Sequence, residues 1–352
     1  MKIALIGRYG EGDIIPGPER VARELYQQFK KNNIDVTFIE YFFTSYSDYS
    51  FLKKIFGKKK KGNNVLRLGI LPLIFRLLKE RYDVIHFINT QRFQIIIFSL
   101  KQFLKAKFVS SFHGFCKNET KLISVKRSFL DLWIEKLSVT KSDILIFPSK
   151  LLLNLFEKEY EINQKHAMVP NGVEEDFIRE QIVPDFSKEY KFVYYNSFDV
   201  GLEELLNEFS SNPNFRLFVI GKGREIENKN NVDITFINPM DKGSLFNFLS
   251  DKQFVIKSSA FDSFSIFVAE CMCSGVIPIV SENIGIKDFI ENGMNGFVYD
   301  SSVPNNLNEI FNDIQTGKYD LNTISANAKK IYEQLNWGKI SKQYLSIYKS
   351  VL

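Results

Sequence analysis

Two acidic residues flanking an expected helix start are the part of this sequence best suited to chemistry. Seven residues separate Asp262 from Glu270, and the small residues Ser263 and Ser265 follow the first acid. An apolar helical run carries Glu270, and a second apolar run, 276–280, predicts a buried parallel strand. One half of a sugar-nucleotide site can be built in this way. One carboxylate would face the sugar, the helix N-terminus the diphosphate, and the other carboxylate the ribose.

Strand and helix patterns alternate on both sides of these residues. In the first half we expect strands at 2–6, 35–41, 84–88, 108–112 and 144–147, and a helix over 19–31. In the second half we expect strands at 192–195, 217–220, 234–236, 254–257 and 276–280, and helices over 201–209, 242–249, 265–274 and 287–291. Alternation of this kind predicts doubly wound parallel sheets. The turn sequence 170–172 is expected to separate two domains.

Bulk properties agree with two domains and exclude several classes of protein. A chain of 352 residues, 45% of them hydrophobic, can form two packed cores. Its three cysteines, Cys116, Cys271 and Cys273, are too few for a disulfide framework, and no zinc-ligand spacing occurs. No apolar run reaches the ~18 residues of a membrane span. Residues 1–7 are expected to form a first strand instead of a signal peptide, which places the chain in the cytoplasm.

Positive charge gathers in the first half of the chain. The net charge of +5 divides into about 29 basic and 18 acidic side chains in the first 175 residues and an acidic excess in the rest. The segment 51–62 reads FLKKIFGKKKKG. Its members expected at a membrane or acceptor surface are Lys53, Lys54, Phe56, Lys58, Lys59, Lys60 and Lys61. We favour an anionic membrane surface as the partner. A solvated loop is the alternative, and nucleic acid is disfavoured because no nucleic-acid motif accompanies the segment.

Residues 262–275 resemble the acid-x7-acid signature of glycosyltransferase family 4, the retaining GT-B enzymes. That signature is usually written Glu-x-Phe-Gly-x4-Glu-Ala-Met-Ala-x-Gly. Five further motifs resemble the family in order and spacing: Gly17-Pro18-Glu19-Arg20, Asp83-Val84-Ile85-His86, Phe112-His113-Gly114, Val169-Pro170-Asn171-Gly172-Val173 and Val219-Ile220-Gly221-Lys222-Gly223. The resemblance therefore runs through most of the chain and is more specific than any one motif.

The resemblance implies an α/β fold of the GT-B class, with two Rossmann-like doubly wound domains facing across a cleft. It implies an acceptor-side domain over 1–170 and a nucleotide-sugar-binding domain over 174–334. A terminal helix over 337–352 would cross back onto the first domain. Enzymes of this class use a nucleotide-diphospho sugar as co-substrate and no metal, so we expect no metal or other cofactor.

Site residues follow from the same resemblance. His113 and Asp262 are expected at the reacting sugar, and Glu270 at the ribose hydroxyls. His86 is interpreted as a core residue. The remaining donor-binding residues are expected to be Gly17, Ser263, Phe264, Ser265, Ile266, Lys222 and Arg224. Asp262 departs from the family's Glu and is shorter by about 1.5 Å. Capping the helix is an equally good interpretation of this residue.

A second departure concerns the charge of the leaving diphosphate. The family normally supplies an Arg and a Lys, about five residues apart, within 194–201, whereas this chain has neither from 192 to 215. Losing both would weaken stabilisation of a dianionic leaving group. The candidate replacements are Lys222, Arg224, Lys257, Arg8 and Arg20, and the sequence does not choose among them.

The expected function is that of a retaining, metal-independent hexosyltransferase. It would move a sugar from a UDP- or GDP-sugar to a membrane-proximal or lipid-linked glycan acceptor, in cell-surface polysaccharide or glycolipid synthesis. Its expected place is peripheral, at the inner face of the cell membrane. The alternative is a non-catalytic GT-B partner or chaperone of an active glycosyltransferase, because the Arg/Lys pair is missing. A nicotinamide oxidoreductase is disfavoured, because residues 7–12 lack the G-x-G-x-x-G spacing.

Overall fold

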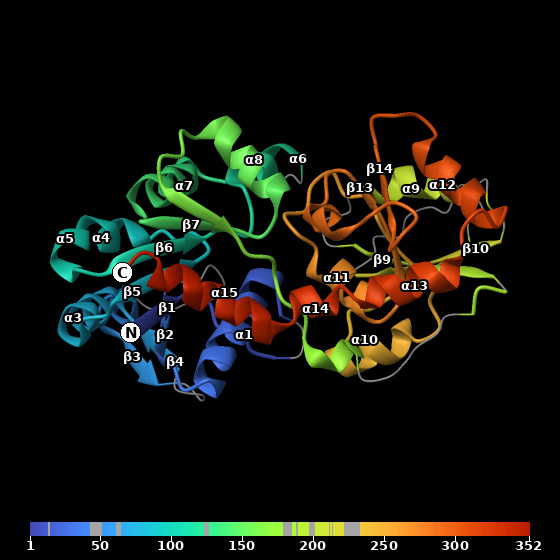
Figure 1. Cartoon of the computed structure of the whole chain (residues 1–352). Helices are drawn as coiled ribbons and strands as arrows, with labels where there is room; N and C mark the ends of the chain where they lie inside the picture. The colour runs from blue at the N-terminus through green and yellow to red at the C-terminus, as the bar shows by residue number, and fades with distance from the viewer. Residues whose placement is uncertain are drawn as a thin grey trace. The chain divides into compact units, whose positions relative to one another are not determined.

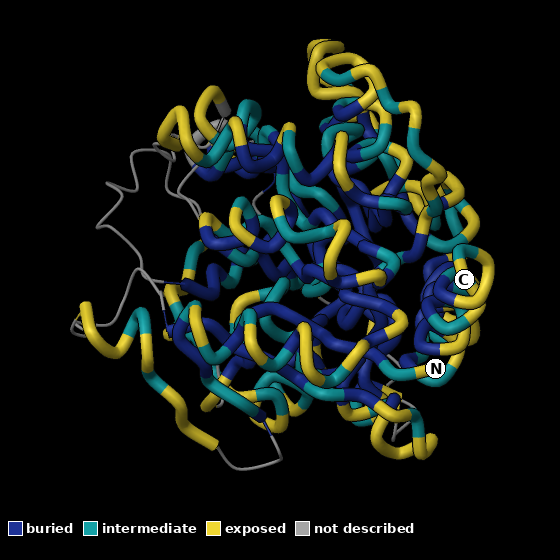
Figure 2. Tube along the Cα trace, turned by 90° about the vertical axis from the view of Figure 1, so that its left-hand side faces the viewer, coloured by how far each residue is buried: buried dark blue, intermediate teal, exposed yellow. Residues whose placement is uncertain are grey.

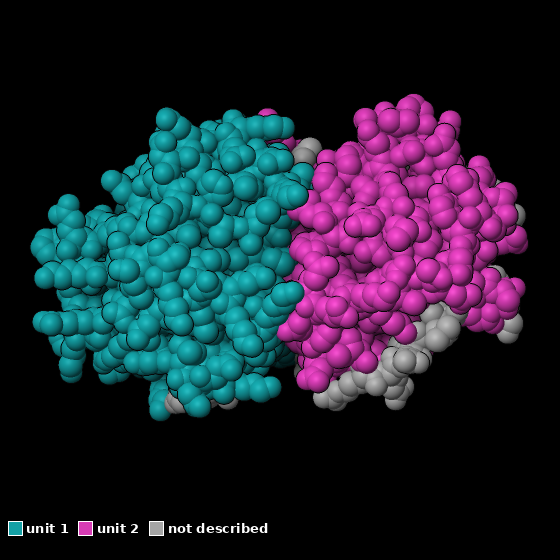
Figure 3. All heavy atoms as spheres, in the orientation of Figure 1, with its two compact units in different colours: residues 1–120, 125–170, 337–352 teal, residues 121–124, 171–336 magenta. Residues whose placement is uncertain are grey.

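The computed structural model describes residues 1–12, 15–42, 51–60, 65–122, 127–178, 185–187, 189–196, 201–210, 212, 214–221 and 233–352. The chain divides into two compact units (Figure 3). Unit 1 comprises residues 1–120, 125–170 and 337–352, and unit 2 comprises residues 121–124 and 171–336. Each unit contains one β-sheet with helices, and each is described by itself below.

Unit 1 contains an eight-stranded sheet in the order β3-β4-β2-β1-β5-β6-β7-β8, parallel except for β3 (Figure 1). Its strands are β1 (Lys2–Ile6), β2 (Asp35–Tyr41), β3 (Lys58–Lys60), β4 (Val65–Leu68), β5 (Val84–Ile88), β6 (Lys107–Ser111), β7 (Ile144–Phe147) and β8 (Lys165–Met168). Its helices are α1 (Gly17–Lys31), α2 (Phe51–Phe56), α3 (Ile70–Glu80), α4 (Gln94–Ser99), α5 (Lys101–Leu104), α6 (Cys116–Leu122), α7 (Phe129–Lys141), α8 (Lys150–Glu159) and α15 (Trp337–Lys349). Helix α6 ends within residues 121–124, which group with unit 2.

Unit 2 contains a six-stranded parallel sheet in the order β11-β10-β9-β12-β13-β14. Its strands are β9 (Tyr190–Tyr195), β10 (Phe215–Ile220), β11 (Asp233–Ile237), β12 (Phe254–Lys257), β13 (Ile277–Ser281) and β14 (Phe297–Tyr299). Its α-helices are α9 (Leu202–Ser210), α10 (Lys242–Leu249), α11 (Ile266–Cys273), α12 (Asn306–Gln315), α13 (Leu321–Lys329) and α14 (Tyr332–Leu335). Two 3-10 helices, η2 (Glu175–Ile178) and η3 (Gly285–Phe289), complete it.

The predicted alternation of strands and helices is confirmed, with boundaries that differ by one or two residues. One predicted helix is wrong in type: residues 287–291 were expected to be α-helical, but a 3-10 helix spans Gly285–Phe289. The lysine-rich segment 58–60, expected at a membrane surface, forms an exposed edge strand that pairs antiparallel with β4. Strands β4, β8 and β14 were not predicted, because a short strand lacks enough alternation to stand out.

Aromatic side chains fill much of the core of unit 2. The ring of Phe192 on β9 stacks on Phe254 of β12, with ring centroids 4.9 Å apart. Phe209, Phe215 and Phe311 pack around the same ring. Buried residues concentrate on the inner strands of both sheets, whereas the edge strands β3, β8 and β11 carry exposed residues (Figure 2). The high phenylalanine content is thus explained in large part by core packing.

Helix α15, the last element of the chain, packs in unit 1 beside α1 (Figure 1). Its residue Tyr348 is fully buried, and the Tyr348 hydroxyl lies 2.6 Å from Nδ1 of His86. The other ring nitrogen, Nε2, hydrogen-bonds to the hydroxyl of Ser111. A neutral imidazole satisfies both contacts with one donor and one acceptor. His86 is therefore a core residue, as predicted, and it joins β5, β6 and α15.

We predict that unit 1 loses stability in mild acid through His86. Burial lowers the pKa of His86 to about 3, whereas the unfolded value is about 6.5. Between these values only the unfolded chain binds this proton, so the free energy of unfolding falls as the pH falls. The His86 contribution should be about 2 kcal/mol at pH 5 relative to pH 7. Urea unfolding of the wild type and His86→Gln at both pH values measures it. Equal pH dependence of the two proteins would contradict the prediction.

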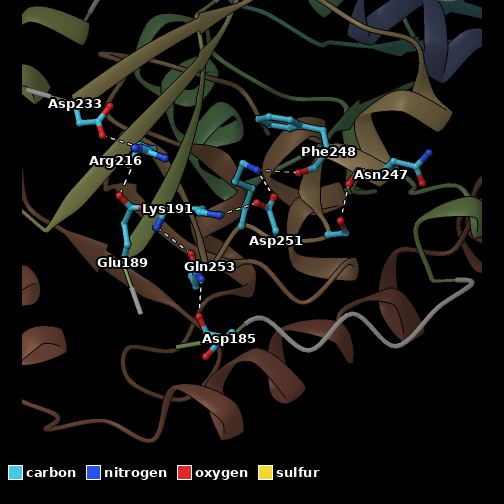
Figure 4. A network of polar contacts seen from close by, with 11 residues as sticks. Asp185, Glu189, Lys191, Arg216, Asp233, Asn247, Phe248, Asp251 and Gln253 are labelled. Atoms are coloured by element: carbon cyan, nitrogen blue, oxygen red, sulfur yellow. Dashed lines mark hydrogen bonds and ion pairs between the residues drawn. The ribbon is translucent and has the colours of Figure 1, made fainter. Parts of the chain in front are cut away.

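Ion pairs and hydrogen bonds join strands near the amino ends of the unit 2 sheet (Figure 4). Arg216 of β10 lies 2.7 Å from Asp233 of β11. Lys191 of β9 pairs with Asp251, and its backbone N–H donates to the side chain of Gln253 ahead of β12. These contacts join neighbouring strands at the amino ends of the sheet. Open parallel sheets bind ligands at the other edge, at the carboxyl ends of their strands.

Candidate functional site

The unit 2 sheet changes direction between β9 and β12. From β9 the chain continues outward through β10 and β11, and it then returns to place β12 on the other side of β9. Such a topological switch point opens a crevice at the carboxyl ends of the two strands, and ligands of open α/β sheets bind there. Here the carboxyl ends of the two strands are Tyr195, the last residue of β9, and Lys257, the last residue of β12.

Asp262 lies on the loop that leads from β12 to α11, and its backbone is held on both sides. Its N–H donates to the carbonyl of Asn283, and its own carbonyl accepts from Gly285. The Oδ1 atom accepts the backbone N–H groups of Phe264 (3.1 Å) and Ser265 (2.9 Å). Asp262 is not the N-cap of α11: that position is Ser265, and Asp262 binds the two loop N–H groups that precede the first helical residue. The side chain of Asp262 remains 28% exposed, so it is both fixed and accessible.

Ser265 adopts a left-handed backbone conformation, with φ of +70°. This conformation costs an L-residue about 1–2 kcal/mol and costs glycine little. We therefore predict that Ser265→Gly raises the free energy of unfolding by about 1 kcal/mol, after allowance for the added freedom of the unfolded chain. Urea unfolding tests this, with Ser244→Gly, in the first turn of α10, as the matched control that should not be stabilised. A destabilised Ser265→Gly protein would contradict the prediction.

Glu270 lies on the second turn of α11 and is 2% exposed. The apolar residues around it on the helix, including Cys271 and Met272, are fully buried. Its carboxylate acts on Tyr195: burial raises the pKa of the Tyr195 hydroxyl, and the negative charge of Glu270 raises it further. The ring of Tyr195 also packs on Phe267, with centroids 5.1 Å apart. Glu270 therefore belongs to the switch-point region, although most of its surface is enclosed by protein.

Tyr195 is a member of this site that sequence reasoning did not single out. It is half-buried at the end of β9, and its neighbour Tyr194 is fully buried. The usable signal was its position as the last residue of an apolar run, since side chains that follow a buried parallel strand reach the ligand edge.

Lys257 is buried at the same edge, with 4% of its side chain exposed. Its Nζ donates to the carbonyl of Tyr195 over 3.4 Å and lies 3.9 Å from Oδ2 of Asp262. Burial lowers the pKa of Lys257, and the charge of Asp262 opposes part of that shift. The structure thus brings together Asp262, Glu270, Lys257 and Tyr195 in unit 2.

His113 lies in unit 1, after the end of β6. Its ring nitrogens are enclosed by protein, and burial lowers the pKa of His113 to about 4, so the imidazole is neutral at neutral pH. The segment that follows is fixed by Glu135 of α7. The Glu135 carboxylate accepts the backbone N–H of Cys116 (2.9 Å) and the hydroxyl of Tyr160 (2.9 Å). A neutral histidine at a strand end can donate or accept a hydrogen bond but carries no charge.

Of the other residues expected to bind the donor, some lie in unit 1 and some lie outside the described residues. Gly17 is the first residue of α1. Lys222 and Arg224 lie outside the described residues, as do residues 197–200 of the segment 194–201 in which the family's Arg and Lys are expected. Arg8, a candidate replacement, pairs with Glu19 in unit 1 at 3.4 Å. Within the described ranges, no group of three or more His, Cys, Asp or Glu side chains could hold a metal ion.

Lysines and aromatic residues of α2 and β3 are exposed together. Phe51, Leu52 and Phe56 of α2 are each more than half exposed. Lys53, Lys58, Lys59 and Lys60 are exposed, Lys54 is half-buried, and Lys61 lies outside the described residues. Hydrogen bonds connect this segment to the start of α3, where Gly69 donates to the carbonyl of Gly57 (2.7 Å). In the described part of the chain, no helix is long and apolar enough to cross a membrane.

Family models and a related protein all identify this chain as similar to glycosyltransferases. Two family models cover most of the chain: Glycosyltransferase Family 4 matches residues 15–177, and Glycosyl transferases group 1 matches residues 176–331. A protein of Methanocaldococcus jannaschii described as an uncharacterized glycosyltransferase is 22% identical over 263 residues, which are 72% of this chain and 71% of that protein.

Two solved structures illustrate the likeness in fold. Sucrose-phosphate synthase from Thermosynechococcus elongatus has a TM-score of 0.80 at 16% identity, covering 99% of this chain and 98% of that one. HepE from Anabaena, solved with UDP and glucose, has a TM-score of 0.67 at 15% identity, covering 99% and 100%. At such identities the likeness shows the fold alone. The predicted GT-B class, with two Rossmann-like sheets, is confirmed.

Proposed function

Because the chain belongs to the glycosyltransferases of family 4, we propose that it is a retaining hexosyltransferase. Its donor would be a UDP- or GDP-sugar and its acceptor a membrane-proximal or lipid-linked glycan. The observation that carries the proposal is the placement of Asp262 and Glu270, two carboxylates that flank the first turn of α11 at the switch point. HepE, which shares the fold, was solved with UDP and glucose, which favours a uridine nucleotide.

The donor half of the reaction fits unit 2. Glu270 would accept hydrogen bonds from the ribose hydroxyls, and Asp262 would accept them from the sugar. The first turn of α11 would face the diphosphate, because the amides of Ile266, Phe267 and Val268 precede the first intrahelical bond, from Ala269 to Ser265. The N–H groups of Phe264 and Ser265 already donate to Asp262. We therefore assign the diphosphate to the helix amides more than to the loop amides.

Transfer breaks the bond between the anomeric carbon and the diphosphate oxygen and forms a bond from that carbon to the acceptor oxygen. The nucleoside diphosphate leaves with the bonding electron pair, and the acceptor hydroxyl gives up its proton. Positive charge develops on the sugar and negative charge on the leaving group. Asp262 would steady the sugar, and the neutral imidazole of His113 would accept or donate a hydrogen bond there without adding charge. No step requires a metal, so we propose metal-independent transfer.

The acceptor side of the proposal rests on the exposed surface of unit 1. Helices α2 and α3 are in contact and carry exposed aromatic residues, including Phe51 (73% exposed) and Phe75 (67% exposed), and the lysines of β3 are exposed as well. Exposed apolar groups mixed with basic residues suit the interface of an anionic membrane, at about 1 kcal/mol per lysine near the surface. We propose peripheral attachment to such a membrane, which would bring a lipid-linked acceptor to the enzyme.

Thermal unfolding in the presence of UDP, GDP, ADP and their common sugar conjugates tests the donor proposal. Stabilisation by one nucleotide family identifies the donor class. Sugar transfer that persists in EDTA supports metal independence. Stabilisation by none of the nucleotides would favour the alternative, a non-catalytic GT-B partner, which the absence of Arg and Lys from 192 to 215 motivates.

Sedimentation with lipid vesicles tests the membrane proposal. The protein should sediment with phosphatidylglycerol vesicles and not with phosphatidylcholine vesicles. A variant with Lys58, Lys59 and Lys60 changed to Glu should lose most of this binding, because three charges change sign at an exposed edge and the net charge falls by six units. A variant with the exposed residues Lys339, Lys342 and Lys349 of α15 changed to Glu has the same net charge and is the control. Equal binding of both variants would reject this surface.

A further inference from the structure

We propose that Lys257 supplies the positive charge that holds the donor diphosphate, in place of the Arg/Lys pair absent from this chain. The inference rests on the proposed function and names a residue for the same site. It also selects one of the five candidate cations that the sequence left open.

Position is the first argument. Lys257 is the last residue of β12, and its Nζ lies 3.4 Å from the carbonyl of Tyr195, the last residue of β9. The ammonium therefore spans the two strands between which the sheet changes direction, which is where the ligand crevice opens. The next residue, Ser258, donates from its hydroxyl to the carbonyl of Gly201 (3.0 Å), at the start of α9. The ends of two strands and the start of a helix thus meet around this lysine.

Closeness to α11 is the second argument. The Asp262 carboxylate lies between Lys257 and the helix start: Oδ1 accepts from Phe264 and Ser265, and Oδ2 faces the ammonium. Only the carboxylate of Asp262 therefore separates Lys257 from the residues that begin the turn facing the diphosphate. An anion there would interact with the helix dipole and with the ammonium together.

Burial is the third argument. An ammonium that is 4% exposed is costly unless an anion or strong acceptors compensate it. Its distances of 3.4 Å to the Tyr195 carbonyl and 3.9 Å to Asp262 are both longer than the 2.7–2.9 Å typical of a charged hydrogen bond. The ammonium also lies over the ring of Tyr194, 5.9 Å from its centroid. A ring face accepts no charged hydrogen bond of this strength, so we infer that oxygens of a diphosphate would fill the remaining donor capacity of Lys257.

Four other described cations of unit 2 have partners of their own. Lys191 and Arg216 form ion pairs near the amino ends of the strands (Figure 4). Lys242 pairs with Glu174 and Asp176, and Lys287 donates to the carbonyl of Glu282. Lys257, in contrast, lies at the carboxyl end of β12 and contacts the last residue of β9.

Calorimetric titration with a nucleoside diphosphate and the matching monophosphate separates this role from a purely structural one. The wild type should prefer the diphosphate. Lys257→Met should bind the diphosphate about 30-fold more weakly, while its affinity for the monophosphate changes less than about threefold. Lys257→Arg, which keeps the charge, should retain the preference for the diphosphate. Lys191→Met, which removes a lysine at the opposite edge, should bind both nucleotides as the wild type does.

Three outcomes would overturn the inference. A Lys257→Met protein that is folded and binds the diphosphate as tightly as the wild type shows that Lys257 serves only to balance Asp262. Equal weakening of both nucleotides also assigns it a structural role. If the wild type binds no nucleotide, the proposed function fails first and the inference fails with it. Should Lys257→Met not fold, Asp262→Asn is compared with Asp262→Asn/Lys257→Met, because the double variant leaves no buried charge without a partner.

Discussion

Replacement of Glu270 by alanine is expected to weaken nucleotide binding about 100-fold. A carboxylate that accepts two ribose hydroxyls contributes charged hydrogen bonds of about 1.5–3 kcal/mol each, and part of this is recovered from water in the variant. Glu270 is 2% exposed and its neighbours on α11 are buried apolar residues. No neighbouring side chain can therefore supply the missing hydrogen-bond acceptor in the variant. Titration of the wild type and Glu270→Ala with the nucleotide that stabilises the wild type gives the ratio directly.

Two further variants make the Glu270 result specific. Glu270→Gln keeps an acceptor of the same size and should bind about tenfold more weakly than the wild type, since an amide accepts a weaker hydrogen bond than a carboxylate. Glu309→Ala removes an exposed acid of α12 in the same unit and should leave nucleotide binding unchanged. Full nucleotide affinity in Glu270→Ala would reject the assignment of Glu270 to the ribose. It would leave this acid with a role in packing α11.

Residue periodicity was sufficient to predict the strands and helices that carry this site, because each is long enough to show a buried face. Strand β12 was predicted over its observed range, and α11 to within one residue at each end. The spacing of Asp262 and Glu270 then placed one acid before the helix and the other on its second turn. These are local properties, so the sequence contains them directly.

The sheet order was not available from periodicity alone. That β9 lies between β10 and β12 depends on which strands pair, and pairing is a long-range property of the fold. For this reason the sequence could not choose among Lys222, Arg224, Lys257, Arg8 and Arg20. The structure favours Lys257 because its burial and its contact with Tyr195 depend on β9 and β12 being neighbours.

The edge strand β3 illustrates a different limit. Lys58, Lys59 and Lys60 carry no alternation of apolar and polar residues, and all three are exposed. An edge strand needs only backbone hydrogen bonds to one neighbour, and lysines at an edge discourage pairing with other chains. The run of lysines was therefore interpreted by its charge alone, whereas the backbone pairs with β4. Both descriptions apply, because the backbone joins the sheet while the side chains remain exposed.

Truncation of Phe192 to alanine is expected to cost unit 2 about 3–5 kcal/mol of unfolding free energy. The side chain is fully buried at the centre of the aromatic core, stacked on Phe254 and surrounded by Phe209, Phe215 and Phe311. The four remaining rings lie on β10, β12, α9 and α12, and they cannot fill the resulting cavity without leaving their own contacts. Loss of this size is a large part of the stability of an ordinary domain.

Urea unfolding of Phe192→Ala, monitored by far-UV circular dichroism, measures the loss of unfolding free energy. Phe236→Ala is the matched control: it removes the same side chain from β11, at the end of the sheet order, where the ring is 39% exposed, and should cost less than about 1 kcal/mol. The ring of Phe192 is buried in the core. Phe192→Ala should therefore weaken nucleotide binding only by raising the fraction of molecules in which unit 2 is unfolded. Nucleotide at saturating concentration should therefore restore part of the lost stability. A Phe192→Ala protein as stable as the control would mean that the core of unit 2 is not packed around this ring.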